Sequence, residues 1–193
     1  MNDFKKEYQA IKPEIDSAIG TMLESGWYIL GDISKTFEKN FASYIGSKYA
    51  IGVANGLEAL QISLMALGIG AGDEVITVSN SAVATALAIT NTGAIPVFVD
   101  VDDYFHMDLE KLEAAITPKT KAIIPVHLFG QLVDIEGVME IAKKHNLQVV
   151  EDACQAHGAA LNSKKAGSFG VMGCFSFYPT KNLGGYGDGG AIT

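Results

Sequence analysis

The sequence has few cysteines, few basic residues and no long apolar run, and each shortage excludes a class of protein. Two cysteines, Cys154 and Cys174, are too few for a disulfide framework and lack metal-ligand spacing, so no metal site is expected. Lysine and arginine number 14 against 22 acidic residues, and a net charge of −8 argues against a nucleic-acid binder. No run could span a membrane, and residues 1–7 lack the apolar core of a signal peptide. We expect a cytoplasmic protein without a membrane partner.

The proportions of hydrophobic and charged residues indicate a globular domain. The 193 residues are 48% hydrophobic and 19% charged, which is enough for one domain with a sizeable core. The last residues, Gly189–Thr193, read as a glycine loop followed by the opening of a strand. We therefore expect the sequence to be a fragment whose second part is missing.

The order of apolar patterns predicts the fold class. Residues 4–25 have helical spacing, with a helix start near Pro13 because proline is tolerated in the first turn. From residue 49 onward short apolar runs alternate with helical patterns, which predicts a doubly wound α/β sheet. Runs without polar alternation are typical of parallel strands covered on both faces. Strands are expected at 49–54, 74–78, 95–99, 121–126, 147–151 and 172–177, and helices at 33–45, 56–67, 82–90, from 108, and at 134–145.

The first candidate binding group is the turn between the strand at 49–54 and the next helix. Asn55 and Gly56 lead directly into that helix. A helix amino end offers unpaired N–H groups and the positive end of its dipole, which suit a phosphate. An ordinary turn with Asn55 as the N-cap is the alternative.

Two further candidates follow later strands, where ligands of α/β sheets bind. Asp152 follows a buried strand and needs a cationic partner, unless it caps a short helix starting at Ala153. Lys181 stands alone between an aromatic strand, which ends near Ser176, and a glycine-rich loop. A lysine that loses its proton can form a Schiff base with a carbonyl; a surface lysine in a turn is the alternative.

One small molecule would explain all three groups. A helix amino end suits a phosphate, an aspartate suits a ring cation and a lysine suits an aldehyde. Pyridoxal phosphate (PLP) carries these three groups, and its ring acts as an electron sink when an aspartate keeps the ring nitrogen protonated. The sequence therefore predicts a PLP site.

The sequence resembles the DegT/StrS-type family of nucleotide-sugar aminotransferases, which belongs to the fold-type I PLP enzymes. The resemblance spans nearly the whole chain. It rests on six motifs, at 25–31 (SGWYILG), 54–60 (ANGLEAL), 72–76 (GDEVI), 125–131 (PVHLFGQ), 151–158 (EDACQAHG) and 175–184 (FSFYPTKNLG).

This resemblance implies an architecture. It implies a three-layer αβα sandwich with a mostly parallel sheet, which is the large PLP-binding domain, with the small C-terminal domain missing. Residues 33–193 would form the large domain. Residues 1–32 would form a helix and an aromatic loop at the interface of a homodimer with shared active sites.

The resemblance also implies residue roles. Lys181 would carry the cofactor as a Schiff base and then act as general acid and base, and Asp152 would pair with the ring nitrogen. The other cofactor contacts would come from Gln155 to the ring 3-oxygen, from the Ser176 hydroxyl and the Leu57 and Glu58 amides to the phosphate, and from Gly56 and Ala82.

Three aromatic residues are candidates for the substrate site. Trp27 and Tyr28 lie in an irregular, glycine-bounded stretch, and the residues alone leave core packing and ligand or partner contact equally open. The resemblance places this stretch near the nucleotide-sugar site, which favours contact. Tyr186 in the glycine-rich loop is the third candidate.

One position departs from the family pattern. Many members have an aromatic residue, matching the segment 79–85 here, that stacks on the cofactor ring. In this chain the position falls on or near Ala82, which cannot stack. Either a neighbour such as Asn80 covers the ring, or small apolar groups do.

The expected activity is transfer of an amino group from an amino acid, glutamate in our prediction, to a keto group of a nucleotide-linked sugar. One alternative is a related PLP-dependent sugar dehydratase, although its hallmark is a histidine where this chain has Lys181. A second is a non-catalytic PLP-binding or regulatory protein. A third, a generic nucleotide-binding domain, lacks its Gly-x-Gly-x-x-Gly motif after the first strand.

Overall fold

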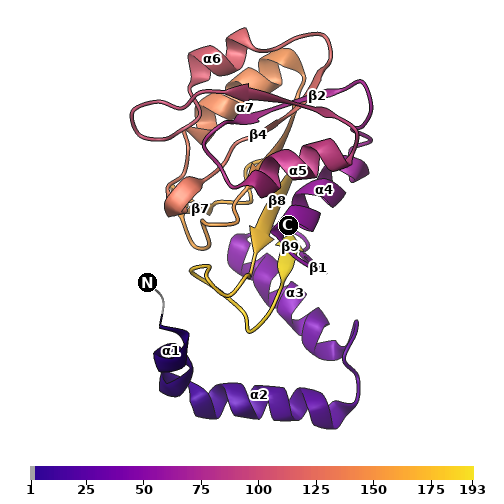
Figure 1. The fold of residues 1–193 in the computed structure, drawn as a ribbon, viewed down its shortest axis with the longest axis vertical. Helices are drawn as coiled ribbons and strands as arrows, with labels where there is room; N and C mark the ends of the chain where they lie inside the picture. The colour runs from indigo at the N-terminus through magenta and orange to yellow at the C-terminus, as the bar shows by residue number, and fades with distance from the viewer. Residues whose placement is uncertain (1–2) are drawn as a thin grey trace.

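The computed structural model describes residues 3–193 (Figure 1). Its helices are α1 (Phe4–Ala10), α2 (Lys12–Ser25), α3 (Asp32–Ile45), α4 (Gly56–Ala66), α5 (Val83–Asn91), α6 (Leu109–Ala114) and α7 (Ile135–His145), with a 3-10 turn at Leu128–Gly130. Its strands are β1 (Ile51–Val53), β2 (Glu74–Val78), β3 (Ile95–Val99), β4 (Thr120–Ile124), β5 (Gln148–Asp152), β6 (Ala160–Leu161), β7 (Lys164–Lys165), β8 (Met172–Ser176) and β9 (Gly190–Ile192).

Seven strands form one mostly parallel sheet, in the order β1-β9-β8-β5-β4-β2-β3. The pairs among β3, β2, β4, β5 and β8 are all parallel, which confirms the predicted α/β class. β9 pairs antiparallel with both β8 and β1. The carboxyl ends of β5 and β8 therefore point to the same edge, where ligands bind in such sheets.

Helices cover both faces of this sheet and make the three layers (Figure 1). On one face α4 and α5 pack on strand residues such as Val75 and Ile124. On the other face α6 and α7 pack on Ile76, Ile123 and other alternate residues of the same strands. This alternation arises because successive strand side chains point to opposite faces.

The prediction of a covered parallel strand at residues 49–54 is wrong in two respects. β1 contains only residues 51–53, and it is an antiparallel edge strand rather than a covered parallel one. Ile51 and Gly52 are exposed because only β9 flanks this strand. On its free side, the Gly52 amide donates to Glu38 of α3 at 2.9 Å.

Two strand pairings after Asp152 were not fully predicted by the apolar pattern of the sequence. A two-stranded hairpin, β6–β7, has strands of two residues each, too short for a periodic signal. β9 begins at Gly190, close to the strand opening expected at the end of the sequence, and it inserts between β1 and β8.

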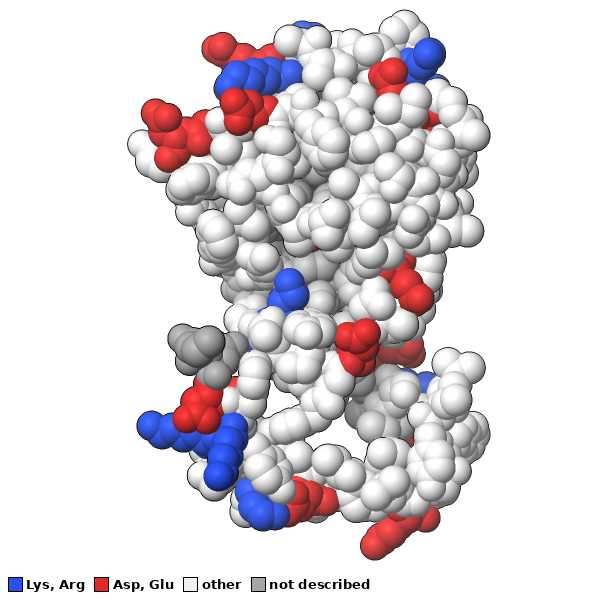
Figure 2. Space-filling view, viewed as in Figure 1, with Lys and Arg blue, Asp and Glu red and all other residues white. Residues whose placement is uncertain are grey.

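The N-terminal segment forms an arm that packs little on the rest of the chain. Pro13 lies in the first turn of α2, as predicted, and a separate helix α1 precedes it. Neither helix contains a buried residue. Figure 2 shows open space between this arm and the body of the domain. Among the described residues, no helix is long and apolar enough to cross a membrane.

Candidate active site

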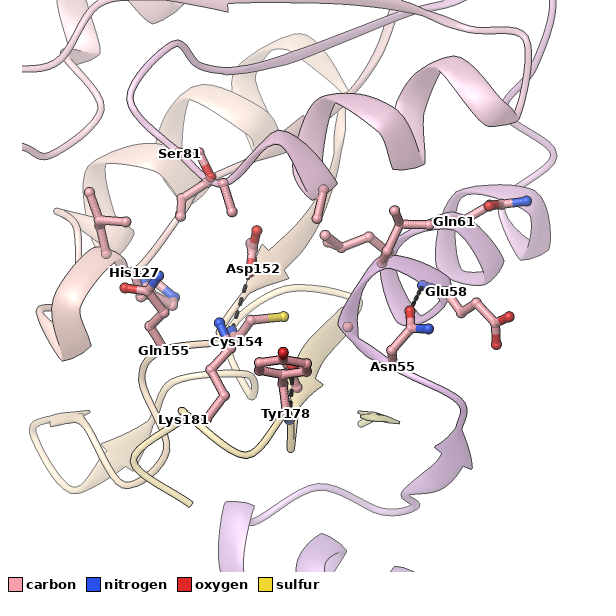
Figure 3. A pocket seen from close by; sticks show the side chains of 18 of the residues that line it. Asn55, Glu58, Gln61, Ser81, His127, Asp152, Cys154, Gln155, Tyr178 and Lys181 are labelled. Carbon is pink, nitrogen blue, oxygen red and sulfur yellow. Dashed lines mark hydrogen bonds between the residues drawn. The ribbon is translucent and has the colours of Figure 1, made fainter. Parts of the chain in front are cut away.

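A cavity of about 660 Å³ lies at the carboxyl ends of β5 and β8, between the amino ends of α4 and α5 (Figure 3). All eight residues expected to contact a cofactor line it, namely Gly56, Leu57, Glu58, Ala82, Asp152, Gln155, Ser176 and Lys181. The fold therefore brings together groups that are up to 125 residues apart in the sequence. The roles expected of them remain predictions.

The amino end of α4 opens into this cavity with two free amides. Asn55 is the N-cap, and its side chain accepts from the Glu58 amide at 2.9 Å, while the Glu58 carboxylate accepts from the Ala54 amide at 3.3 Å. This reciprocal cap engages the Glu58 N–H, which corrects the expectation that this amide is free for a phosphate. The amides of Gly56 and Leu57 have no acceptor among the described residues, and they offer the anion site.

Gly56 permits a close approach, but to protein rather than to open space. A Cβ atom at this position would lie 2.7 Å from the Cys154 Sγ and 2.8 Å from the Ser176 Cβ. The absence of a side chain lets the start of α4 pack directly against β8 and the turn after β5. The amino end of α4 is thereby held beside the strand ends that carry Asp152 and Ser176.

Asp152 is the last residue of β5 and is only 6% exposed. Its Oδ1 accepts from the Cys154 amide at 3.2 Å and its Oδ2 from the Thr85 hydroxyl at 2.8 Å. No helix begins at Ala153, so the carboxylate caps only its own turn. A carboxylate has about four lone-pair positions, so capacity remains for a donor in the cavity.

Lys181 extends from the loop after β8 into the cavity, where its end lies beside Cys154 and near Asp152 (Figure 3). It is partly buried. Its ammonium has no hydrogen bond or ion pair of its own among the described residues. A lysine side chain directed into a cavity without a carboxylate partner is available to react with a ligand there, which favours this interpretation over that of a surface lysine.

Gln155 and Ser176 each present a donor to the cavity. The Gln155 Oε1 accepts from the Phe129 amide at 2.9 Å, which leaves its Nε2 as the free end. The Ser176 Oγ accepts weakly from the Tyr178 amide at 3.3 Å, which leaves its hydroxyl hydrogen unused among the described residues. Both donors suit oxygen acceptors on a ligand.

The face of the cavity near α5 is lined by small groups. Ser81, Ala82 and Ala84 line it, whereas Asn80 does not and is exposed. Of the two alternatives left open for this face, the described residues favour small side chains. Opposite them lies Cys154, whose pKa is raised well above its ordinary value by burial and by Asp152, so its thiol is neutral.

Sequence reasoning did not assign His127 and Glu151, which form a fully buried pair at the base of the site. The His127 Nδ1 accepts from the Val133 amide at 3.3 Å, so its Nε2 donates to the Glu151 carboxylate at 3.0 Å. Glu151 also accepts from the amides of Gly167, Phe169 and Gly170 at 2.6–2.8 Å. Both ring nitrogens are occupied, so His127 positions the ends of β4 and β5 rather than a ligand.

The three aromatic residues expected at the substrate site do not line this cavity in the described chain. Trp27 and Tyr28 are 58% and 61% exposed on the arm, which excludes the core alternative within the described residues. Tyr186 is exposed in the glycine-rich loop and makes an edge-on contact with Tyr8 at 6.2 Å. Their substrate role stays a prediction.

A family comparison matches residues 9–193 to the DegT/DnrJ/EryC1/StrS aminotransferase family. The chain belongs to this family. The match covers α2 through β9 and all the residues that line the cavity, so the site described above is the site of a family member.

Two named relatives match the whole chain, which spans about half of their length. One from Acidithiobacillus ferrooxidans is 48% identical over 193 residues, 100% of this chain and 52% of its own, and is named a UDP-N-acetyl-3-dehydro-α-D-glucosamine 3-aminotransferase. A relative from Geobacillus stearothermophilus is named a pleiotropic regulatory protein. It is 50% identical over 193 residues, which are 100% of this chain and 52% of the relative.

Solved structures confirm the fold as that of the large domain of family members. DesV from S. venezuelae, in complex with a ketimine intermediate, has a TM-score of 0.97 and 46% identity, and the match covers 99% of this chain and 52% of DesV. NtdA from Bacillus subtilis, with bound cofactor PMP, has a TM-score of 0.86 and 38% identity over 94% of this chain and 42% of NtdA.

The residues of this chain fit a PLP molecule. Two free amides and a hydroxyl suit the phosphate, and the buried Asp152 carboxylate retains capacity for the ring N–H. The free Gln155 Nε2 suits the ring oxygen, and Lys181 suits the aldehyde. Each polar group of PLP thus has a complementary group among the described residues that line the cavity.

Proposed function

We propose that this chain forms the cofactor half of a PLP-dependent aminotransferase that acts on a nucleotide-linked keto-sugar. The observation that carries the proposal is the convergence of Lys181, Asp152 and the free amides of α4 on one cavity. The UDP-sugar substrate in the name of the Acidithiobacillus relative supports the substrate class. The amino donor in the proposal is glutamate.

Each residue has a distinct task in this reaction. PLP, when bound, supplies an electron sink for the carbon that loses and gains the amino group. The Lys181 Nζ would hold the cofactor at its aldehyde carbon, and its free amine would move a proton to and from the reacting carbons. Such positioned acid–base catalysis contributes about 10²–10⁴ in rate. Asp152 holds the proton on the ring nitrogen.

The charge of the site indicates that groups outside this cavity complete it. The sequence has 14 lysines and no arginine, and Lys181 is the one lysine that lines the cavity among the described residues. Phosphates and a donor carboxylate bring several negative charges. We therefore propose that a second copy of the chain and the further sequence of a full-length protein contribute cations, in a homodimer with shared active sites.

Reduction of the bound cofactor tests the proposal. The full-length protein, incubated with PLP, should gain a visible absorption band, and borohydride should fix the label on the peptide that contains Lys181. Lys181→Ala should lose the fixed label, whereas Lys48→Ala, which changes an exposed lysine above Tyr49, should keep it. Retention of the label in Lys181→Ala would overturn the assignment.

Addition of glutamate separates the aminotransferase from its alternatives. The visible band should bleach to the absorption of the amine form of the cofactor. No change with any amino acid would favour a non-catalytic regulatory protein, the alternative consistent with the name of the Geobacillus relative. Asp152→Asn should reduce turnover more than it weakens PLP binding, because it removes the partner of the ring cation.

A further inference from the structure

Asp152 accepts a hydrogen bond from one buried hydroxyl group, which in turn contacts a second hydroxyl. The Thr85 Oγ1 lies 2.8 Å from the Asp152 Oδ2, and the Ser81 Oγ lies 2.8 Å from the Thr85 Oγ1. Ser81 precedes α5 and Thr85 lies in its first turn, so both belong to an element remote in sequence from β5. The three groups form one continuous hydrogen-bonded chain.

Each hydroxyl group has only one hydrogen to donate, and this fixes the direction of the two hydrogen bonds. Thr85 has one hydroxyl hydrogen and donates it to the carboxylate. The bond between Ser81 and Thr85 must then be donated by Ser81, because Thr85 has only lone pairs left to offer. Ser81 thus donates to Thr85 and Thr85 donates to Asp152, and consecutive hydrogen bonds of this kind polarise one another in the same sense. The arrangement stabilises the negative charge of the carboxylate.

Thr85 acts on the carboxylate without reaching the ligand space. It is 1% exposed and does not line the main cavity; it borders a separate one of about 270 Å³ that Ser81 and Phe98 also line. α5 carries no charged residue, so hydroxyl groups are the polar support that it provides. The other titratable groups in the cavity that Asp152 lines are Lys181, Glu58, His127, Tyr178 and Asp188, and Cys154, Cys174 and Glu151 lie on the neighbouring strands and turn.

We propose that Thr85, oriented by Ser81, is a positioning residue that keeps the Asp152 carboxylate aimed at the ring nitrogen of the cofactor. The inference rests on the proposed function, since it assigns a role toward PLP. A carboxylate that is held by a buried hydroxyl on one oxygen and by the Cys154 amide on the other cannot rotate away from the cavity. A charge-assisted hydrogen bond is also about twice as strong as a neutral one, so its loss should be measurable.

The test measures the protonation of the ring nitrogen directly. PLP labelled with ¹⁵N in the ring is bound to the full-length protein, and its NMR signal distinguishes a protonated from a neutral nitrogen. In Thr85→Val the signal should move toward the neutral position and kcat should fall about tenfold, the size of one hydrogen bond to a charged group. The dissociation constant of PLP should change by less than about threefold, because the phosphate and lysine contacts remain.

Three variants serve as matched comparisons. Thr85→Ser keeps the hydroxyl and should restore the ¹⁵N signal and kcat. Ser81→Ala removes only the outer donor and should shift the signal in the same direction by a smaller amount. Thr77→Val removes another buried threonine hydroxyl, which donates to the Ile124 carbonyl at 3.0 Å, and should leave the signal unchanged.

The outcomes separate this inference from the proposed function. A wild-type protein that binds no PLP at Lys181 contradicts the proposed function itself. A wild type that binds PLP at Lys181, with an unchanged ring signal in both Thr85→Val and Ser81→Ala, overturns the positioning role alone. If Thr85→Val does not fold, an unchanged signal in Ser81→Ala overturns it.

Discussion

Gly56 shows at the scale of one residue how the packing of the domain constrains the site. Its missing side chain allows the start of α4 to contact Cys154 and Ser176, and these contacts hold the free amides of α4 near Asp152. Gly56→Ala should therefore lower the free energy of unfolding by about 1–3 kcal/mol, as overpacking does in cores. It should also weaken PLP binding, because the helix end must move. Urea denaturation and a PLP titration measure the two effects.

A second glycine gives the control for this prediction. Gly20 lies inside α2, and a Cβ atom there would meet nothing within 4 Å. Gly20→Ala should raise the free energy of unfolding by about 0.5–1 kcal/mol, since alanine loses less conformational freedom in a helix. A Gly56→Ala variant as stable as the wild type would show that the contact with Cys154 and Ser176 relaxes without cost.

The sequence predicts best those residues of the site that lie close to the end of a strand. Asp152, Ser176 and Lys181 come at or just after strands, so their place at the ligand-binding edge follows from the α/β pattern. Thr85 reads as one more small residue in a helix, and nothing in its neighbourhood indicates a contact 67 residues away. Glu151 does end the strand expected at 147–151, but the buried amides that it accepts from lie in a turn after β7 that no apolar pattern marks.

At the scale of elements, one contact joins the two turns that carry Gln155 and Lys181. The His157 Nδ1 lies 2.8 Å from the Asn182 Oδ1, and the Asn182 Nδ2 donates to the His157 carbonyl at 3.0 Å. Since the amide oxygen is an acceptor, the imidazole must donate from Nδ1. The ring is held at 5.3 Å from the Phe177 ring. This pair connects the turn after β5 to the loop after β8.

This contact predicts a pH dependence of stability. Burial, and then the charge of Lys181, lower the pKa of His157 below its ordinary value of 6.5, although the Asn182 contact opposes them. The unfolded chain therefore binds a proton at this residue at a higher pH than the folded protein does. Stability from this residue is present above pH 6.5 and is lost as pH falls below it.

Comparison with His157→Gln measures this contribution. Between pH 8 and pH 5, the free energy of unfolding should fall less steeply in the variant than in the wild type, because glutamine does not titrate. Chemical denaturation at several pH values tests this, and the data above pH 7.5 give the loss of packing alone. Parallel pH profiles for the two proteins would contradict the role of His157.

The sheet shows how far pattern reasoning extends at this scale. β2, β4, β5 and β8 are buried apolar runs, and their places were predictable because a covered parallel strand needs such a run. β1 and β9 have three residues each, and their antiparallel pairing depends on a chain reversal through the glycine-rich loop. Gly190 must pass so close to Asn55 that a Cβ atom would lie 2.5 Å from its backbone. No periodicity encodes such a contact.

At the scale of the whole molecule, the arm formed by α1, α2 and residues 26–31 requires an explanation. Ile29 and Leu30 are each 78% exposed, and neither arm helix contains a buried residue. Leu30 also has a φ of 52°, in the left-handed region that costs energy for residues with a side chain. An exposed apolar segment of this kind is typical of an interaction surface, and we predict, as the family resemblance implies for residues 1–32, that a second copy of the chain covers it.

The oligomeric state tests this proposal. Light scattering of the full-length protein should give the mass of two chains, and Ile29→Asp combined with Leu30→Asp should reduce it to one, because charged side chains cannot be buried without partners. Tyr104→Asp, which changes an exposed aromatic residue in the loop before α6, should leave the dimer intact. A single-chain mass for the wild type, or a double variant that remains a dimer, would remove the arm from the interface. A single-chain mass for the wild type would also mean that no second copy supplies cations to the site, where Lys181 is the one lysine among the described residues.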